Sequence, residues 1–324
     1  MLKEAKESGT MPKKLSLRTE EIRAKRFSFC EGVQFDYDPI DYFYLPGLVR
    51  PTGAGFLTPV FFNRDALVQY YNHPDYTVSF GSDTYGTIYT PSNYISFGIN
   101  RSNKIIMWLG DIDEMPRSEQ LYLASKNVAS DHDIGSEFYE GQIEVEFTEY
   151  SKEQLVVKKL SEFADAIFKK HKVKMLQLDD EALPLIKSLK PPVHFSDKEM
   201  GDSMEAFNKL LVERINTAML KFDLQLLLTP AEAKKLQSLG GLKTLELWLL
   251  KRASVIDASA RMNALFVLYD LRVVFKHLQS AEKKSNTMEN CCERLGLAHK
   301  ASNESIYNAL LKNIVVFYSE TRLS

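Results

Sequence analysis

The spacing of apolar residues changes near Ser151, and this change constrains the fold more than any other feature of the chain. Before it, apolar and acidic residues alternate in Ile143-Glu-Val-Glu-Phe-Thr-Glu-Tyr150, the period of a strand with one buried face. After it, apolar residues recur with the period of an amphipathic helix. The sequence therefore predicts an α+β protein in which a strand-rich N-terminal domain is followed by an all-α helical bundle.

The N-terminal half carries short aromatic and β-branched runs bounded by Gly, Pro, Asn and Asp, as strands do. Two of these runs surround a short polar turn at 101–103 and predict a hairpin. Helices are expected at Arg64–Tyr71, after Asn63, and at Arg117–Lys126, after Pro116. The predicted strands are 42–45, 57–62, 76–80, 84–89, 94–100, 104–109 and 142–150.

The C-terminal half carries helix-start signals and no strand signal. Ser151 with Gln154, Asp202 with Glu205, and Thr229-Pro230 with Glu232 match the pattern of capped helix starts, and Gly240-Gly241 matches a helix end. The predicted helices are 152–172, 203–224, 230–239, 242–253, 257–279, 287–295 and 302–320.

Charge divides the 324 residues into three parts: a charged tail at 1–26, an acidic α+β domain at 27–150 and a helical bundle at 151–324. The middle part holds 6 Lys or Arg against 18 Asp or Glu, whereas the last part holds 27 against 21. Because phosphate groups bind to cationic surfaces, RNA is an expected partner only of the C-terminal half. The acidic half is expected to sense or bind a protein partner.

Composition excludes several protein classes. No run approaches the roughly 18 apolar residues of a membrane span, and the tail lacks the apolar core of a secretory signal, so no membrane association is expected. The three cysteines Cys30, Cys291 and Cys292 form neither a disulfide framework nor a zinc pattern, which favours the reducing cytoplasm. Phosphate-binding, dinucleotide-binding and serine-hydrolase motifs are absent from the sequence.

One segment pairs an arginine with a histidine near the end of a strongly apolar helix. In Ala264-Leu-Phe-Val-Leu-Tyr-Asp-Leu-Arg-Val-Val-Phe-Lys-His-Leu278, four residues separate Arg272 from His277. Histidine moves protons near neutral pH, and a guanidinium grips phosphate oxygens bidentately, so the pair suits metal-free chemistry on a phosphodiester. On one helix the two side chains do not share a stripe and need a second helix or a partner chain to converge.

This segment resembles the Arg-x4-His segment of HEPN-type helical bundles, which occur in prokaryotic toxins, abortive-infection proteins and metal-free RNA-cleaving enzymes. The resemblance implies RNA cleavage through the ribose 2′-hydroxyl in a homodimer, with His277 as the general acid or base and Arg272 on the scissile phosphate. Val273 departs from the polar residue that the family usually has at that position. A second match, Arg294 to His299, is interrupted by Gly296, so Arg272 and His277 are preferred.

Two other groups of residues are weaker candidates. Asp131, His132 and Asp133 offer ligands for Mg²⁺, Mn²⁺ or Ca²⁺ and leave metal-dependent hydrolysis as a third hypothesis. The basic run Phe168-Lys-Lys-His-Lys-Val-Lys174 suits contact with RNA phosphates.

The leading hypothesis is thus a cytoplasmic, metal-independent endoribonuclease or RNA-binding effector of a prokaryotic defence or stress system, without a cofactor. Its acidic N-terminal domain would sense a partner and restrain the basic half. The alternative is a non-catalytic interaction or scaffold protein whose helical domain dimerises, with Arg272 and His277 serving structure alone.

Overall fold

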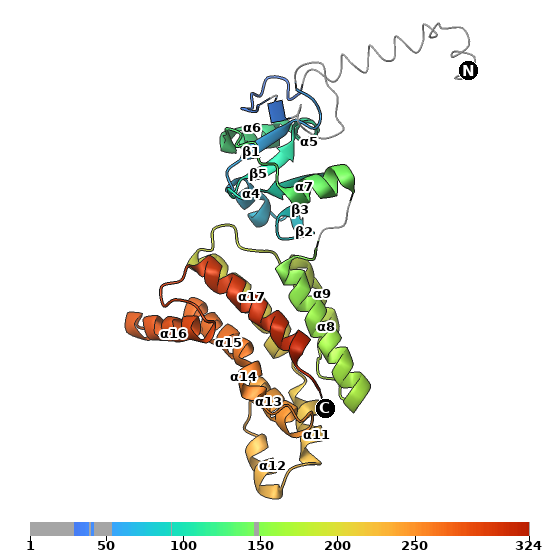
Figure 1. The fold of residues 1–324 in the computed structure, drawn as a ribbon, viewed down its shortest axis with the longest axis vertical. Helices are drawn as coiled ribbons and strands as arrows, with labels where there is room; N and C mark the ends of the chain where they lie inside the picture. The colour runs from blue at the N-terminus through green and yellow to red at the C-terminus, as the bar shows by residue number, and fades with distance from the viewer. Residues whose placement is uncertain (1–28, 39, 42–53, 92, 146–148, 324) are drawn as a thin grey trace, which may run out of the picture. The chain divides into compact units, whose positions relative to one another are not determined.

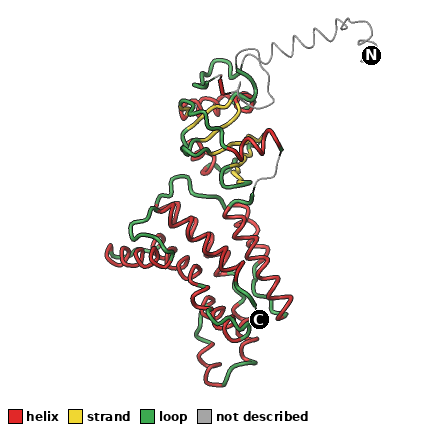
Figure 2. Tube along the Cα trace, viewed as in Figure 1, coloured by secondary structure: helices red, strands yellow, loops and turns green. Residues whose placement is uncertain are grey.

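The computed structural model describes residues 29–38, 40–41, 54–91, 93–145 and 149–323 (Figures 1 and 2). It separates into two compact units, Met1–Glu149 and Tyr150–Ser324. The N-terminal unit contains a sheet and the C-terminal unit consists mainly of helices, as the apolar spacing predicts. The expected charged tail at 1–26 and the expected strand at 42–45 lie outside the described residues.

The N-terminal unit is built on a six-stranded antiparallel sheet with the order β2-β3-β4-β5-β1-β6. The hairpin expected around residues 101–103 is confirmed, with Ile99 opposite Ile105. The strands are β1 (Pro59–Phe62), β2 (Thr77–Phe80), β3 (Tyr85–Tyr89), β4 (Tyr94–Ile99), β5 (Ile105–Trp108) and β6 (Asn127–Val128). The helices are α4 (Ala66–Asn72), α5 (Leu109–Asp113), α6 (Arg117–Lys126) and α7 (Ser136–Tyr139).

Helix α7 packs closely on the sheet because β4 offers it a glycine. Phe138 lies in a buried cluster with Phe61, Ile106 and Trp108, and its ring stacks on Trp108 at a centroid distance of 4.6 Å. A Cβ atom at Gly98 would lie 2.5 Å from the Phe138 Cβ, so only glycine leaves room for this helix.

The prediction of a strand at 142–150 is wrong for its first residues, 142–144. Residues Glu140–Glu144 instead continue α7 as a π-helical turn, η1, and Val145 has left-handed backbone with φ 57°. Gln142 donates to the Tyr85 hydroxyl at 2.7 Å, and Ile143 packs against the Phe138 cluster. These tertiary contacts override the alternating pattern. Residues 146–148 lie outside the described residues.

The edge strand β6 is short, and the side chain of Asn127 adds hydrogen bonds to those of its backbone. The Asn127 amide accepts a hydrogen bond from the Asp36 N–H at 2.5 Å and donates to the Asp36 carbonyl at 3.0 Å. It also donates to the Phe61 carbonyl of β1 at 2.8 Å. The segment that contains Asp36 thereby lies along this edge of the sheet, and Phe35 packs edge-on against Phe62.

The C-terminal unit packs its helices around one large apolar core. Helix α8 lies beside α17 (Figure 1). Helix α10 lies beside α15. The helices are α8 (Lys152–His171), α9 (Asp179–Ser188), α10 (Asp197–Asn208), the π-helical η2 (Lys209–Glu213), α11 (Thr217–Gln225), α12 (Pro230–Leu236), α13 (Gly241–Lys251), α14 (Ala258–Arg261), α15 (Asn263–Lys276), α16 (Ala281–Arg294) and α17 (Asn303–Glu320). Within the described ranges, no helix is long and apolar enough to cross a membrane.

Two expected helix starts are confirmed and one is wrong. Ser151 caps α8, and Thr229 caps α12 in a capping box with Glu232. The helix expected at 203–224 begins earlier, at Asp197, where Ser196 and Glu199 form the capping box. It is also divided into α10, η2 and α11.

The division at Arg214–Asn216 follows from contacts with the segment before α9. The Gln177 N–H donates to the Arg214 carbonyl and the Asn216 N–H donates to the Met175 carbonyl, so neither group continues a helix. The Asn216 side chain then caps α11. Helix α9 was not among the expected helices, and the helix expected at 257–279 is α14 followed by α15.

Candidate functional site

Arg272 lies on α15 and is held by a carboxylate of α10. Its Nε atom lies 2.5 Å from Glu205 Oε2, and the two side chains are 23% and 24% exposed. One turn further along α15, Lys276 Nζ lies 2.5 Å from Asp202 Oδ1. The hydrogen bond from Arg272 holds the pKa of Glu205 below its usual range and raises the pKa of Arg272. The pair is therefore ionised and fixes the plane of the guanidinium.

The two helices approach closely where these ion pairs form. Gly201 of α10 is buried, and a Cβ atom there would lie 3.3 Å from Lys276 and 3.4 Å from Phe275. This approach brings Glu205 within reach of the Arg272 Nε. In the described part of the chain, Nη1 and Nη2 of Arg272 make no hydrogen bond, so the outer edge of the guanidinium remains available.

His277 is not on the helix that carries Arg272, contrary to the expectation of a helix to residue 279. Helix α15 ends at Lys276, and His277 is its C-cap with extended backbone (φ −111°, ψ 144°). Its N–H donates to the Val273 carbonyl at 3.1 Å, and its side chain is exposed. Among the described residues the imidazole makes no hydrogen bond, and none joins it to Arg272. Within the described part of one chain, the imidazole and the guanidinium are thus not joined directly.

The second pair, Arg294 and His299, has a similar arrangement at the end of α16. Arg294 Nη1 lies 2.8 Å from Asp270 Oδ2, and its Nε donates to Asn263 Oδ1 at 2.7 Å. The chain then turns at Gly296, with φ 72°, and His299 is exposed. In both pairs a carboxylate of a neighbouring helix fixes the arginine, and the histidine lies beyond the helix end.

The carboxylate that holds Arg272 does not come from its own helix. Asp270, which is close in sequence, pairs with Arg294, and the carboxylate at Arg272 comes from Glu205, 67 residues away. The crossing of α10 and α15 supplies this contact, and the i, i+3 spacing of Asp202 and Glu205 is its only local signal.

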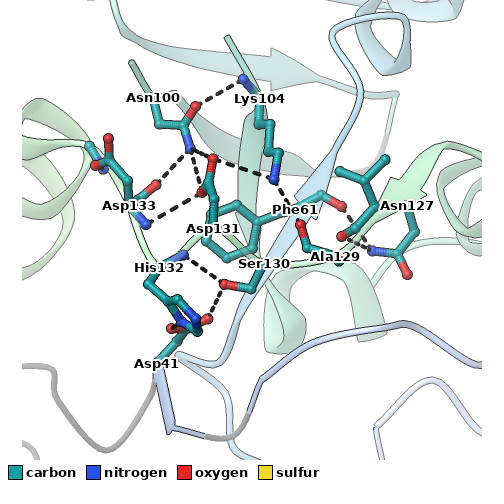
Figure 3. Close-up of polar contacts among 12 residues, drawn as sticks. Asp41, Phe61, Asn100, Lys104, Asn127, Ala129, Ser130, Asp131, His132 and Asp133 are labelled. Atoms are coloured by element: carbon teal, nitrogen blue, oxygen red, sulfur yellow. Dashed lines mark hydrogen bonds and ion pairs between the residues drawn. The ribbon is translucent and has the colours of Figure 1, made fainter. Parts of the chain in front are cut away.

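In the N-terminal unit, Asp131 is bound by residues that flank the turn between β4 and β5 (Figure 3). Asn100 Nδ2 donates to it at 2.9 Å, and Lys104 Nζ lies 3.3 Å from it. Lys104 also donates to the Ala129 carbonyl, and Asn100 to the Asp133 carbonyl, each at 2.9 Å. Burial raises the pKa of Asp131, but the hydrogen bonds and Lys104 lower it more. This carboxylate is a structural anchor for the 129–133 loop.

His132 points to a different partner. Its Nδ1 lies 2.7 Å from Oδ1 of the buried Asp41, whose other oxygen accepts from Ser130 Oγ (Figure 3). The hydrogen bond to Asp41 raises the pKa of His132, whose imidazole is 62% exposed. Its backbone is left-handed, with φ 64°, a conformation that histidine adopts more readily than most residues.

The neighbours Asp131, His132 and Asp133 therefore do not converge. Within the described ranges, no group of three or more His, Cys, Asp or Glu side chains is arranged to hold a metal ion. Metal-dependent hydrolysis thus has no ligand set at this loop.

Comparison of the chain with protein-family models, with curated proteins and with solved structures returns no match.

Proposed function

We propose that the helical unit is a HEPN-like, RNA-binding module that cleaves RNA without a metal ion, and that the N-terminal unit senses a partner and regulates it. The cytoplasm of a prokaryote, in a defence or stress response, is the proposed setting. The hydrogen bonding of the Arg272 side chain supports the proposal. Glu205 fixes the guanidinium through Nε alone, and Nη1 and Nη2 remain able to bind phosphate oxygens.

The chemistry requires only proton transfer and charge stabilisation. The neutral His277 imidazole would accept the proton of a ribose 2′-hydroxyl, whose oxygen forms a bond to phosphorus as the bond to the 5′-oxygen breaks. That oxygen leaves with a proton donated by the His277 imidazolium, and the products are a 2′,3′-cyclic phosphate and a 5′-hydroxyl. Arg272 would offset the charge that develops on the phosphate oxygens.

Convergence of the two groups is proposed to need a second copy of the chain. The exposed His277 follows the end of α15, while Arg272 lies more than one turn earlier. A homodimer would place His277 of one protomer near the Arg272 of the other. The exposed lysines Lys169, Lys170 and Lys172, at the end of α8, are further proposed contacts for RNA phosphates.

The test is incubation of the full-length protein with structured RNAs in EDTA. The parent should leave 2′,3′-cyclic phosphate ends, and Arg272→Ala/His277→Ala should cut at least about 100-fold more slowly. Arg294→Ala/His299→Ala is the matched control, because it removes the same residue types from the same arrangement. Light scattering and circular dichroism check that mass and fold are unchanged.

The outcomes separate three conclusions. Loss of cleavage only in the control variant would move the site to Arg294 and His299. Equal cleavage by all three proteins would exclude both pairs. No cleavage by the parent, with RNA binding that both variants retain, would leave either an enzyme that its N-terminal unit restrains or an RNA-binding module without catalysis.

A specific observation also favours the alternative, an interaction protein without catalysis. The pairs Arg272–Glu205 and Lys276–Asp202 join α10 to α15 and give both cations a structural role. Under this alternative, Arg272→Ala/His277→Ala retains every biological activity of the parent as long as it folds. A cellular assay of host growth arrest, with the folded variant beside the parent, would distinguish the two proposals.

A further inference from the structure

An apolar groove of about 450 Å³ lies between α8 and α9 of the helical unit. Its volume is within the range of small-molecule sites. Phe168 of α8 and Leu183 of α9 stand at its rim and are 53% and 54% exposed. The apolar residues that line it include Val157, Leu160, Ala164, Met175, Leu176 and Ile186.

One part of the groove lining is cationic and largely buried. Arg214 lines the groove from the break before α11, and its side chain is only 11% exposed. Its Nε donates to the Gln177 carbonyl at 3.0 Å, and its Nη2 lies 2.8 Å from Asp179 Oδ1. In the described part of the chain, its Nη1 makes no hydrogen bond. A buried guanidinium thus retains an unused donor beside an apolar surface.

Lys174 adds a second positive charge here. Its Nζ lies 2.9 Å from Asp179 Oδ2, so one carboxylate serves two cations. The hydrogen bonds and charges of Lys174 and Arg214 hold the pKa of Asp179 below its usual range. Asp165 also lines the groove, from α8, and its side chain is exposed to water, which screens its charge. The Lys174–Asp179–Arg214 cluster carries a net charge of one positive unit.

We infer that this groove binds an aliphatic carboxylate, such as a fatty acid. The carboxylate would accept hydrogen bonds from Arg214 Nη1 and Lys174, and the chain would cover the apolar wall formed by α8 and α9. Charge complementarity supports this choice, because a purely apolar ligand would leave the Arg214 donor unpaired and a cationic ligand would be repelled. The site goes beyond the proposed ribonuclease activity and shares no residue with Arg272 or His277.

The experiment titrates the full-length protein with laurate and, separately, with methyl laurate, both below the concentration at which they form micelles, by isothermal calorimetry. Laurate should bind at one site per chain, and the ester at least about tenfold more weakly, the loss expected from one charge-assisted hydrogen bond. Ala164→Leu, which fills the groove, should weaken both ligands.

Two lysine variants locate the head group. Lys174→Gln should weaken laurate without changing the ester, because Lys174 lines the groove. Lys187→Gln is the matched control, since Lys187 is exposed on α9 and does not line the groove. Arg214→Gln is a less clean variant, because Arg214 also binds Gln177 and Asp179.

Three results would overturn the inference. Equal affinity for laurate and its ester would show apolar binding without recognition of the carboxylate. Laurate binding that Ala164→Leu leaves unchanged would place the ligand elsewhere. Absence of laurate binding would exclude the carboxylate site, and a doubled mass that Ala164→Leu returns to that of one chain would then identify the groove as a contact between copies. Ribonuclease activity tests none of these points, so the two proposals fail separately.

Discussion

Two histidines, one in each unit, lie in environments that shift the pKa of the same side chain in opposite directions. His132 in the N-terminal unit is exposed and bound through Nδ1 to the buried Asp41, which raises its pKa. His171 in the helical unit is buried and lies edge-on to Trp248, with ring centroids 5.2 Å apart. Burial, and then Arg252, lowers its pKa, and its buried Nε2 makes no hydrogen bond within the described residues.

The difference gives the two units opposite responses to pH. A histidine whose folded pKa is raised stabilises the fold below its unfolded pKa of about 6.5, and this stabilisation is lost as pH rises through the folded value. A histidine whose folded pKa is lowered stabilises the fold above its unfolded pKa of about 6.5, and this stabilisation is lost as pH falls through the folded value. Mild acid should therefore stabilise the fold of the N-terminal unit and destabilise the fold of the helical unit.

The largest expected effect comes from removing the ring that covers His171. Trp248 is fully buried and donates from Nε1 to Asp223 at 2.8 Å, so Trp248→Ala should destabilise the helical unit by about 3–5 kcal/mol. Hydrogen exchange followed by mass spectrometry should show faster exchange in α8 and α13 and unchanged exchange in β1–β5. Phe222→Ala, at an exposed aromatic residue of α11, is the control. Equal acceleration in both units would show that they unfold together and would invalidate the comparison.

A polar residue should matter most in the N-terminal unit. Asn100→Ala removes the donor to Asp131 and Asp133 and the acceptor for the Lys104 N–H, and should cost about 2–3 kcal/mol. The change would appear as a lower denaturant midpoint of this unit and faster exchange at 129–135. Asn72→Ala, at an exposed asparagine with a local bond to the Val68 carbonyl, should change little. If Asn100→Ala left the stability of this unit unchanged, the loop would not depend on these hydrogen bonds.

The pH responses themselves are testable with two substitutions. Between pH 8 and pH 5.5 the N-terminal unit should gain stability, and His132→Gln should reduce the gain, because glutamine cannot take up the proton. Part of the gain should remain, because burial raises the pKa of Asp111 in the same unit to about 6. The helical unit should lose stability over the same range, and His171→Gln should remove that loss. NMR titration of the two imidazoles is the direct measurement. A His132 that titrates below the unfolded value would contradict the role given to Asp41.

The smallest effect is expected at Arg272. Its ion pair with Glu205 is partly exposed to solvent, so Arg272→Gln should cost no more than about 1 kcal/mol. Thermal unfolding would measure it, with Lys243→Gln as the comparison, because the Lys243 side chain is 58% exposed and also pairs with a glutamate, Glu246. A cost of several kcal/mol would assign Arg272 a mainly structural role and favour the interaction-protein alternative.

Local signals in the sequence predicted local structure. Thr229, Pro230 and Glu232 define a helix start without any distant residue, and the polar turn at 101–103 likewise defines a hairpin. The same capping signal occurs at Ser196 and Glu199, yet Asp202 and Glu205 were preferred. In the folded chain, these two acidic residues instead bind Lys276 and Arg272.

Distant contacts could not be predicted in this way. Alternation at 143–150 indicated a strand, but the Tyr85 hydroxyl and the Phe138 cluster stabilise a π-helical turn there. The Asp41 partner of His132 lies 91 residues away, and the groove between α8 and α9 depends on a helix that contains Pro184 and was not expected. Such features depend on how elements cross, which residue spacing along one element does not encode.

The Asn127 amide has a consequence for the behaviour of the protein at high concentration. A sheet edge with free N–H and C=O groups can pair with an edge of another molecule and start aggregation. On the β6 side, Asn127 and the backbone of Asp36 bind each other. Asn127→Ala would remove these hydrogen bonds and leave backbone groups at that edge unpaired. We expect the variant to be less soluble than the parent during refolding.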